Sequence, residues 1–165
     1  MIRRRKDTEW QDLCASIDSG SLMPWCVTLF HETLACLSDR IRHQAFPAEL
    51  VSRLASDLHI NSRSLIDHLG LHRRAILRKI KQNEHLDANE VERVLGMQRL
   101  VGQVQVMVGK SGNTDGFDAA GWIGEWIELP LPALGGQRPA EFLGDGAGRE
   151  LISQLLRQIQ SGAFA

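Results

Sequence analysis

The sequence predicts an all-α fold, and three observations carry that prediction. Apolar residues recur at the three- and four-residue spacing of amphipathic helices along most of the 165-residue chain. Residues that start or stop helices stand at the ends of these apolar stripes. The alternation of apolar and polar residues that is typical of half-buried strands is hardly found. We therefore expect helices joined by short connections.

Residues 1–45 are expected to form a variable N-terminal helical arm. Helical spacing runs from Leu22 to Ile41, after a polar start with a basic cluster at residues 3–6. That cluster is either a solvated arm or one that contacts phosphate groups. The three cysteines, at positions 14, 26 and 36, lack the CxxC spacing of a zinc site, and their odd number argues against a disulfide framework. We expect them to be small buried apolar residues in a reducing compartment.

Residues 46–109 are expected to form a domain that begins with three short helices. Pro47 is suited to the first turn of the first helix, because a proline has no N–H to leave unpaired there. Asn61 or Ser62 caps the second helix, and Gly70 stops it. The third helix follows almost without a linker. The apolar spacing places these helices over about 47–58, 62–69 and 72–81.

A longer helix closes this domain. Asp87 and Glu90 stand at the spacing of a capping box, in which each side chain accepts a hydrogen bond from the other residue's backbone N–H. Apolar residues then continue at helical spacing from Val91 to about Val108. The run GKSGNTDG at 109–116 is a loop by composition. We place the boundary between a domain over 46–109 and a second one over 110–165 in this region.

The domain over 110–165 is also expected to be helical. Trp122 and Trp126 stand one turn apart in its first helix, where they are suited to anchor a core or an interface. A Pro- and Gly-rich turn follows, and glycines at 144, 146 and 148 break the chain before the last helix, which ends at Gly162. The pattern predicts helices over about 118–127, 139–143 and 149–160.

The charge and hydropathy of the chain exclude some protein classes. The formal net charge is −1, so the chain is not a globally basic coat for nucleic acid. Residues 1–109 carry 15 basic and 13 acidic side chains, a balance of +2, and residues 110–165 carry 4 and 7, a balance of −3. A basic front and an acidic back suggest two faces with different partners. Without a visible signal peptide or an apolar stretch of bilayer length, we expect a cytoplasmic protein with no membrane partner.

Residues 61–81, NSRSLIDHLGLHRRAILRKIK, have the pattern of a helix-turn-helix. Two short helices meet at Gly70, whose backbone can adopt the positive φ of the turn. In this motif the N-terminal half of the second helix enters the major groove, where arginine hydrogen-bonds guanine and pairs with phosphate. The segment contains six basic side chains and only one acidic side chain, an excess that is typical of DNA binding. The alternative is a basic face that is merely solvated. The candidate DNA-binding residues are Arg63, His72, Arg73, Arg74, Arg78 and Lys79.

Motifs for catalysis and metal binding are not convincing. The run GKS at 109–111 is like the end of a phosphate-binding loop, but such a loop needs a glycine where Val104 stands and a strand before it. His68 and His72 are four residues apart, yet Gly70 interrupts the helix that would align them, and a third ligand is missing. The sequence shows no convincing pair of a nucleophile and a general base. We therefore expect that the chain is not an enzyme and binds neither a metal nor a cofactor.

The last fifteen residues, LISQLLRQIQSGAFA, combine an apolar helical stripe with a tail of small residues and Phe164. Such a stripe usually packs in a core. An exposed Phe164 beside a free carboxylate is suited to insertion into the pocket of a partner protein.

Residues from about 61 to 165 resemble the Xre/MbcA/ParS-type antitoxins, the partners of RES-domain toxins. Four strings carry the resemblance: GLHRRAILRKIK, LDANEVERV, WIELPLPALGGQRPAEFL and GRELISQLLRQIQSGAFA. In the family they correspond to a basic recognition helix, a helix start, a Pro- and Gly-rich turn after a tryptophan, and a closing helix. The resemblance implies an all-α protein with a helix-turn-helix DNA-binding core followed by a small helical toxin-binding domain.

The resemblance also implies two partners and no catalysis by the antitoxin itself. The C-terminal domain would cover the NAD-binding cleft of a cognate RES-domain toxin, which degrades NAD or ADP-ribosylates a target, and its terminal residues would reach toward the active site. The helix-turn-helix would bind operator DNA and repress the operon, as a homodimer within a larger toxin–antitoxin complex. The residues that this resemblance assigns to toxin binding are Trp126, Arg138, Arg157, Gly162, Ala163, Phe164 and Ala165.

Two other interpretations stay open on the sequence alone. One is a stand-alone helix-turn-helix transcriptional regulator, whose C-terminal domain serves dimerisation or binds a small ligand near Trp122 and Trp126. The other is an enzyme that uses the loop at 109–116, which nucleotide binding by the purified protein would support. A neighbouring gene for a RES-type toxin favours the antitoxin, and a solitary gene favours the regulator.

Overall fold

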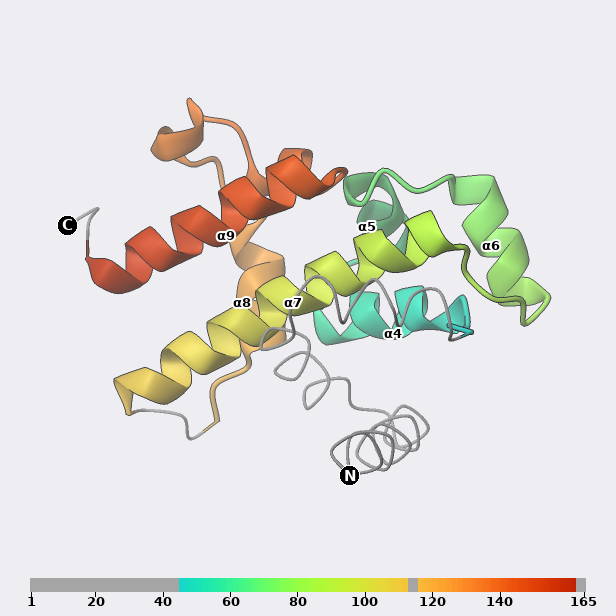
Figure 1. The fold of residues 1–165 in the computed structure, drawn as a ribbon, viewed down its shortest axis with the longest axis horizontal. Coiled ribbons are helices and arrows are strands. Elements are labelled where there is room, and N and C mark those ends of the chain that lie inside the picture. The colour runs from blue at the N-terminus through green and yellow to red at the C-terminus, as the bar shows by residue number, and fades with distance from the viewer. Residues whose placement is uncertain (1–44, 113–115, 163–165) are drawn as a thin grey trace, which may run out of the picture.

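The computed structural model describes residues 45–112 and 116–162, and within these ranges every regular element is a helix (Figure 1). The all-α prediction is therefore confirmed. No helix in these ranges combines the length and the apolar composition needed to span a bilayer. The predictions for the N-terminal arm, its cysteines and its helix at 22–41 lie outside the described residues, as do Ala163, Phe164 and Ala165.

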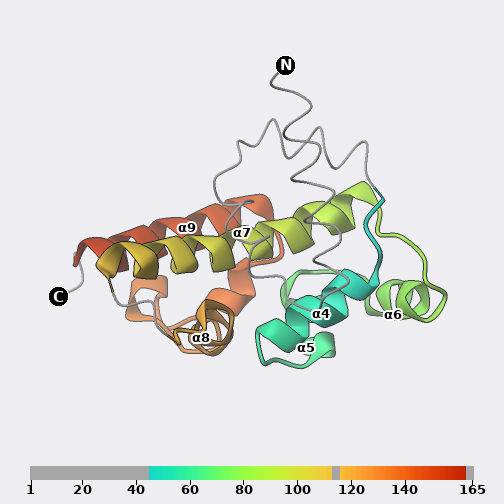
Figure 2. The same ribbon diagram turned by 90° about the horizontal axis from the view of Figure 1, so that it is seen from below.

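Two long helices form one layer of the molecule, and shorter helices cover one side of it (Figures 1 and 2). The long helices are α7 (Ala88–Ser111) and α9 (Gly146–Ser161). The shorter elements are α4 (Glu49–Asp57), α5 (Ser62–His68), α6 (Arg73–Lys81) and α8 (Ala119–Trp126), with the 3₁₀ helices η1 (Pro132–Leu134) and η2 (Pro139–Phe142) between α8 and α9. The helices α4, α5 and α6 lie toward the start of α7, and α8 lies toward its end.

Side-chain caps fix where four of these helices begin. Asp87 accepts a hydrogen bond from the backbone N–H of Glu90 at 2.9 Å, and Glu90 accepts one from that of Asp87 at 2.8 Å. The predicted capping box of α7 is therefore confirmed. Helix α5 begins after Asn61, whose side chain accepts from the N–H of Arg63 at 2.8 Å. Aspartates cap α8 and α9 in the same way.

Helix α4 begins at Glu49, two residues later than the sequence suggests, so that Pro47 lies before the helix and not in its first turn. The carbonyl of Phe46 accepts a hydrogen bond from the N–H of Leu86 at 2.8 Å, and the N–H of Ala48 donates to the carbonyl of Glu84 at 3.0 Å. These two bonds hold the backbone on both sides of Pro47 in an isolated antiparallel bridge. The proline therefore stays extended, where its missing N–H leaves no bond unmade.

The C-terminal end of α7 and the start of α9 differ from the prediction, and glycines are involved in both. Helix α7 continues into the predicted loop as far as Ser111 and stops where Gly112 adopts a φ of +83°. Helix α9 starts at Gly146, about three residues early, so that Gly148 lies inside its first turn. A Cβ atom at Gly148 would lie within 3.0 Å of the carbonyl oxygen of Phe142. This glycine therefore permits close packing and does not break the chain.

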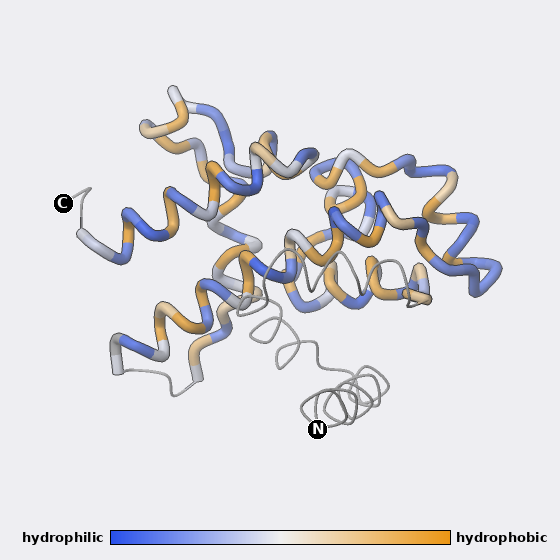
Figure 3. The backbone as a smooth tube through the Cα atoms, viewed as in Figure 1, coloured by the Kyte–Doolittle hydropathy of each residue, from blue (hydrophilic) through white to orange (hydrophobic). Residues whose placement is uncertain are grey.

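One hydrophobic core runs through the described part of the chain. It takes residues from α4 and α5, from both halves of α7, and from α8 and α9. Figure 3 shows apolar and polar stretches alternating along these helices, as expected when one side of each helix is buried. Gly124 of α8 lies against the chain just after α4, where a Cβ atom would come within 3.0 Å of the carbonyl oxygen of Leu58. Helix α8 of the C-terminal half is therefore in direct contact with the chain after α4 of the N-terminal half.

Polar side chains join α7 to α9. Arg149 of α9 is only 5% exposed and pairs with Glu92 of α7. Gly96 leaves the room for it, since a Cβ atom there would overlap the Arg149 side chain. Further along, the amide of Gln103 donates to the carbonyl of Ser153 at 2.9 Å, and the Ser153 hydroxyl donates back at 2.7 Å. The order of these contacts shows that α7 and α9 run in the same direction.

Candidate functional site

Helices α5 and α6 form a helix-turn-helix, and buried residues fix how they cross. Gly70 takes a φ of +62° in the turn between them, which is the conformation that the sequence predicts. Ile66 of α5 and Ile76 of α6 are fully buried in the core. The N–H of Leu71 donates to the carbonyl of Ile66 at 2.9 Å and closes the turn. The opposite side of α6 is therefore left to solvent.

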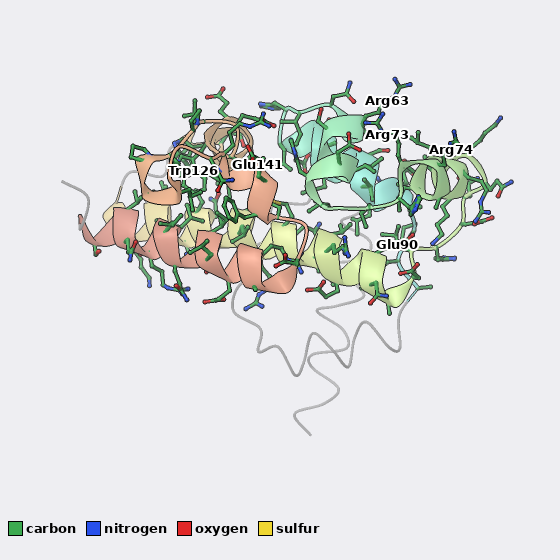
Figure 4. The ribbon with its side chains drawn as sticks, turned by 90° about the horizontal axis from the view of Figure 1, so that it is seen from above. Arg63, Arg73, Arg74, Glu90, Trp126 and Glu141 are labelled. Atoms are coloured by element: carbon green, nitrogen blue, oxygen red, sulfur yellow. The ribbon has the colours of Figure 1, made fainter. Side chains whose placement is uncertain are left out.

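Cationic side chains gather on this exposed side. Figure 4 shows Arg63 and Arg73 on the side of the helix-turn-helix away from α7 and α9, with Arg74 near them on α6. All three are exposed, as is His72 at the start of α6. Arg73 pairs with Asp67 of α5. In the described ranges the guanidinium groups of Arg63 and Arg74 form neither an ion pair nor a hydrogen bond, so both can meet a partner without breaking a contact.

The two remaining DNA-binding candidates point in different directions. Arg78 is exposed and lies 3.5 Å from Glu84. Lys79 is only 14% exposed, and its Nζ lies 2.5 Å from Glu90 and 3.6 Å from Asp87. Burial by itself lowers the pKa of Lys79, but the hydrogen bond and charge of Glu90, supported by Asp87, outweigh burial and raise that pKa above 10.5. The structure therefore places Lys79 at the capping box of α7 and apart from the other candidates.

The apolar face of α9 continues past the folded body of the protein. Ile152 and Leu155 on this face are buried. Ile159 follows Ile152 by seven residues, close to two helical turns, so both lie on the same side of the helix. Ile159 is nevertheless 42% exposed. The helix ends at Gly162, with a φ of +70°, as the sequence predicts.

The other residues assigned to toxin binding differ in exposure. Trp126 is 7% exposed and stacks on Trp122, with ring centroids 5.8 Å apart, so it anchors the fold from inside. Arg138 is exposed and pairs with two glutamates, at 3.0 and 3.2 Å. Arg157 is exposed and pairs with one glutamate at 3.0 Å. Both arginines are cations that a partner can contact on an otherwise acidic half of the chain.

Both halves of the chain match known domains. Residues 38–99 match the antitoxin Xre-like helix-turn-helix domain, and residues 116–162 match the antitoxin Xre/MbcA/ParS C-terminal toxin-binding domain. The chain is also 44% identical over 115 residues to the Prs ADP-ribosylating antitoxin of Sphingobium sp. (strain YBL2), an alignment that covers 70% of this chain and 72% of that protein. The chain belongs to the Xre/MbcA/ParS antitoxin family. It is an antitoxin that joins a helix-turn-helix domain to a toxin-binding domain, and the resemblance seen in its sequence is confirmed.

The structure adds residues of the antitoxin that the sequence does not single out. Arg93 of α7 donates to the carbonyls of Leu69 and Gly70, at 2.9 and 2.6 Å, and so holds the turn of the helix-turn-helix. His68 at the end of α5 lies 2.6 Å from Glu128, which follows α8, and this contact links the two domains. The partners are 24 and 60 positions apart, respectively. Neither helical spacing nor a local motif indicates contacts between residues so distant in the sequence.

The antitoxin holds residues 109–111 in the last turn of α7. A phosphate-binding loop needs an irregular Gly-rich backbone that precedes a helix, so this run does not supply one. Within the two described ranges, His, Cys, Asp and Glu side chains form no group of three that is suited to a metal ion. The two features that stand out are therefore the basic face of α6 and the exposed end of α9.

Proposed function

We propose that this antitoxin neutralises a RES-domain toxin with its C-terminal end and represses its own operon with α6. The observation that carries the proposal is the apolar face of α9, which continues uncovered to Ile159. Such a side chain gains free energy when a partner removes it from water. In this proposal Ile159, Arg157, Gly162 and residues 163–165 contact the toxin over its NAD-binding cleft, and Arg138 lies at the edge of the contact.

The proposed operator contacts come from the exposed side of the helix-turn-helix. Arg74 and Arg78 enter the major groove, while Arg63 and His72 meet the phosphate backbone. Arg73 exchanges its contact with Asp67 for one with phosphate. A homodimer presents two such faces to two half-sites one helical turn apart. The antitoxin performs no catalysis in this proposal, and it meets both partners in the cytoplasm.

Two candidates from the sequence take structural roles in this proposal. Trp126 is buried and supports the toxin-binding domain without contacting the toxin. Lys79 stabilises the start of α7 through Glu90 and Asp87. Both assignments follow from the direction and the burial of the side chains.

The neutralisation experiment co-expresses the chain with the RES-domain toxin encoded beside its gene, followed by co-purification and an assay of NAD consumption. We expect a stable complex that suppresses NAD loss. Ile159→Ser is expected to weaken the complex by about tenfold or more, because burial of such a side chain contributes about 2 kcal/mol. Removal of residues 163–165 is expected to act in the same direction and to spare DNA binding.

Leu77→Ser is the matched control for Ile159→Ser. Leu77 is 39% exposed, as an apolar residue on α6, and its substitution is expected to leave toxin binding unchanged. Equal losses in both variants would contradict the proposed contact. Continued NAD loss with no complex between the native chain and the toxin would contradict neutralisation itself and leave a DNA-binding regulator.

The double variant Arg73→Ala, Arg74→Ala tests the division of labour. It is expected to abolish operator binding while toxin neutralisation stays intact, because neither residue lies in the toxin-binding domain. With the single variants, the slope of log affinity against log salt should fall by about 0.9 for each phosphate that the replaced arginine neutralises in the native complex. A folded double variant that no longer neutralises the toxin would disprove the separation of the two sites.

A further inference from the structure

We propose that Leu77 of α6 is a specificity-determining residue that reads the methyl group of thymine in the operator. This inference rests on the proposed operator binding. Four large apolar side chains are exposed in the described part of the chain, and Leu77 is the one on α6. Leu77 is 39% exposed although the preceding residue, Ile76, is fully buried. Since Ile76 fixes the rotation of α6 about its axis, the exposure of Leu77 follows from the orientation of the helix.

The surroundings of Leu77 indicate what kind of partner covers it. Residues three and four positions apart are neighbours on a helix, so Arg73 and Arg74 flank Leu77 on one side and Lys81 on the other. All three are exposed cations. A second copy of this surface would bring like charges together, which opposes self-association. An apolar group inside a cationic surface instead fits a polyanion that also carries apolar groups.

Duplex DNA has that chemistry in its major groove. Phosphates line the groove edges, and the C5-methyl group of thymine is the apolar group on its floor. With Arg74 and Arg78 hydrogen-bonding base edges or phosphates, Leu77 lies beside Arg74, three positions further along α6, on the exposed part of the helix. Its contact with a thymine methyl would then distinguish thymine from cytosine at one or two positions of each half-site, next to the bases that the arginines contact.

The experiment removes the methyl group and nothing else. Duplexes selected from a random-sequence library by the native chain define the preferred site, and each thymine in it is then replaced, one at a time, by uracil. Uracil keeps the hydrogen-bonding edge of thymine but lacks its methyl group. We expect about fourfold weaker binding at one or two positions, the value for one buried methyl group, and no change elsewhere.

The same duplexes are then bound to variants of Leu77. Leu77→Ala is expected to bind the thymine duplex about fourfold more weakly and to lose nothing further on uracil replacement at the sensitive positions. Leu77→Met keeps an apolar side chain of similar length and should keep the sensitivity. Leu129→Ala, at an exposed leucine outside the helix-turn-helix, is expected to behave like the native chain. Alanine favours helix, so circular dichroism should show an unchanged fold for Leu77→Ala.

Two results would overturn the inference. Native binding that is equally tight for thymine and uracil at every position would show that Leu77 reads no methyl group, while leaving the proposed operator binding in place. A Leu77→Ala variant that keeps the full uracil sensitivity would assign the methyl contact to another residue. If the native chain selects no DNA at all, the proposed operator binding fails, and this inference fails with it.

Discussion

Gly148 and Gly146 lie two residues apart in the first turn of α9 but differ in their surroundings. A Cβ atom at Gly148 would overlap the backbone of Phe142, which cannot move without displacing η2. At Gly146 the nearest atom to such a Cβ is the end of the flexible Arg149 side chain, at 3.8 Å, an ordinary contact distance. Space, and not backbone conformation, therefore decides which glycine is needed.

Gly148→Ala is accordingly expected to lower the free energy of unfolding by about 1–3 kcal/mol, the usual cost of forcing an extra group into a packed site. Gly146→Ala is its matched control and should leave stability unchanged or raise it by up to about 1 kcal/mol, because alanine loses less backbone entropy. Urea unfolding of both variants measures the difference. A similar effect of both substitutions would show that the close contact with Phe142 has no energetic weight.

Helices α6 and α7 share a charged junction. Lys79 near the end of α6 contacts Glu90 and Asp87, which are also the two residues of the α7 capping box. The acidic side chains thus serve the backbone of one helix and the side chain of another. This junction sets the start of α7 against the end of α6, and so fixes the position of α6 that the proposed operator contact would use.

Lys79→Met tests this junction. Since the pKa of Lys79 is raised in the folded state, its contribution to stability is complete at neutral pH and is lost as the pH rises above 10.5 through the raised value. The difference in unfolding free energy between the native chain and the variant should therefore be constant up to about pH 9.5 and shrink at higher pH. The salt dependence of DNA binding should not change; a slope smaller by about 0.9 would show instead that Lys79 contacts a phosphate.

The sequence predicts the helices well because helix starts and stops are local signals. Asp87 with Glu90 and the glycines at 70 and 162 act within one turn, so their roles can be recognised without the tertiary structure. The start of α9 differs because glycine serves equally to stop a helix and to permit close packing, and only the neighbours of Gly148 distinguish the two uses. The C-terminal end of α7 differs because the helix runs past Gly109 and stops at Gly112, which adopts a positive φ. Of the candidate site, the exposed arginines of α6 follow from its helical periodicity. The inward direction of Lys79 depends on Glu90, a partner from the next helix.

At the scale of the molecule, α7 belongs to both halves. Arg93 in its first turns contacts the turn of the helix-turn-helix, while α9 packs along it from Glu92 to Gln103, and α8 packs on it too. The boundary that the sequence suggests, between 109 and 110, lies in its last turn. The family matches end at residue 99 and resume at residue 116, so part of α7 lies between them. One core passes through all of these elements in the described ranges.

We therefore expect one cooperative unfolding transition. Arg149→Met removes the buried cation that contacts Glu92 and the carbonyl of Leu143, and should lower the unfolding free energy by about 2 kcal/mol for the whole described body. Far-UV circular dichroism reports all helices. Fluorescence of Trp122 and Trp126 reports the C-terminal half once Trp10 and Trp25 are replaced by phenylalanine. The two signals should coincide in both proteins; separate midpoints would show that the halves unfold independently.

The shared helix also bears on how such antitoxins diversify by recombination. A crossover between residues 99 and 116 would give Arg149 a foreign partner in place of Glu92. A crossover before Asp87 would keep α7 with α9 but would set the turn of the helix-turn-helix against a foreign residue in place of Arg93. Either exchange separates residues that must fit each other. Operator preference and toxin preference are therefore expected to be inherited together as linked traits, and to change by substitution within one lineage more readily than by domain shuffling.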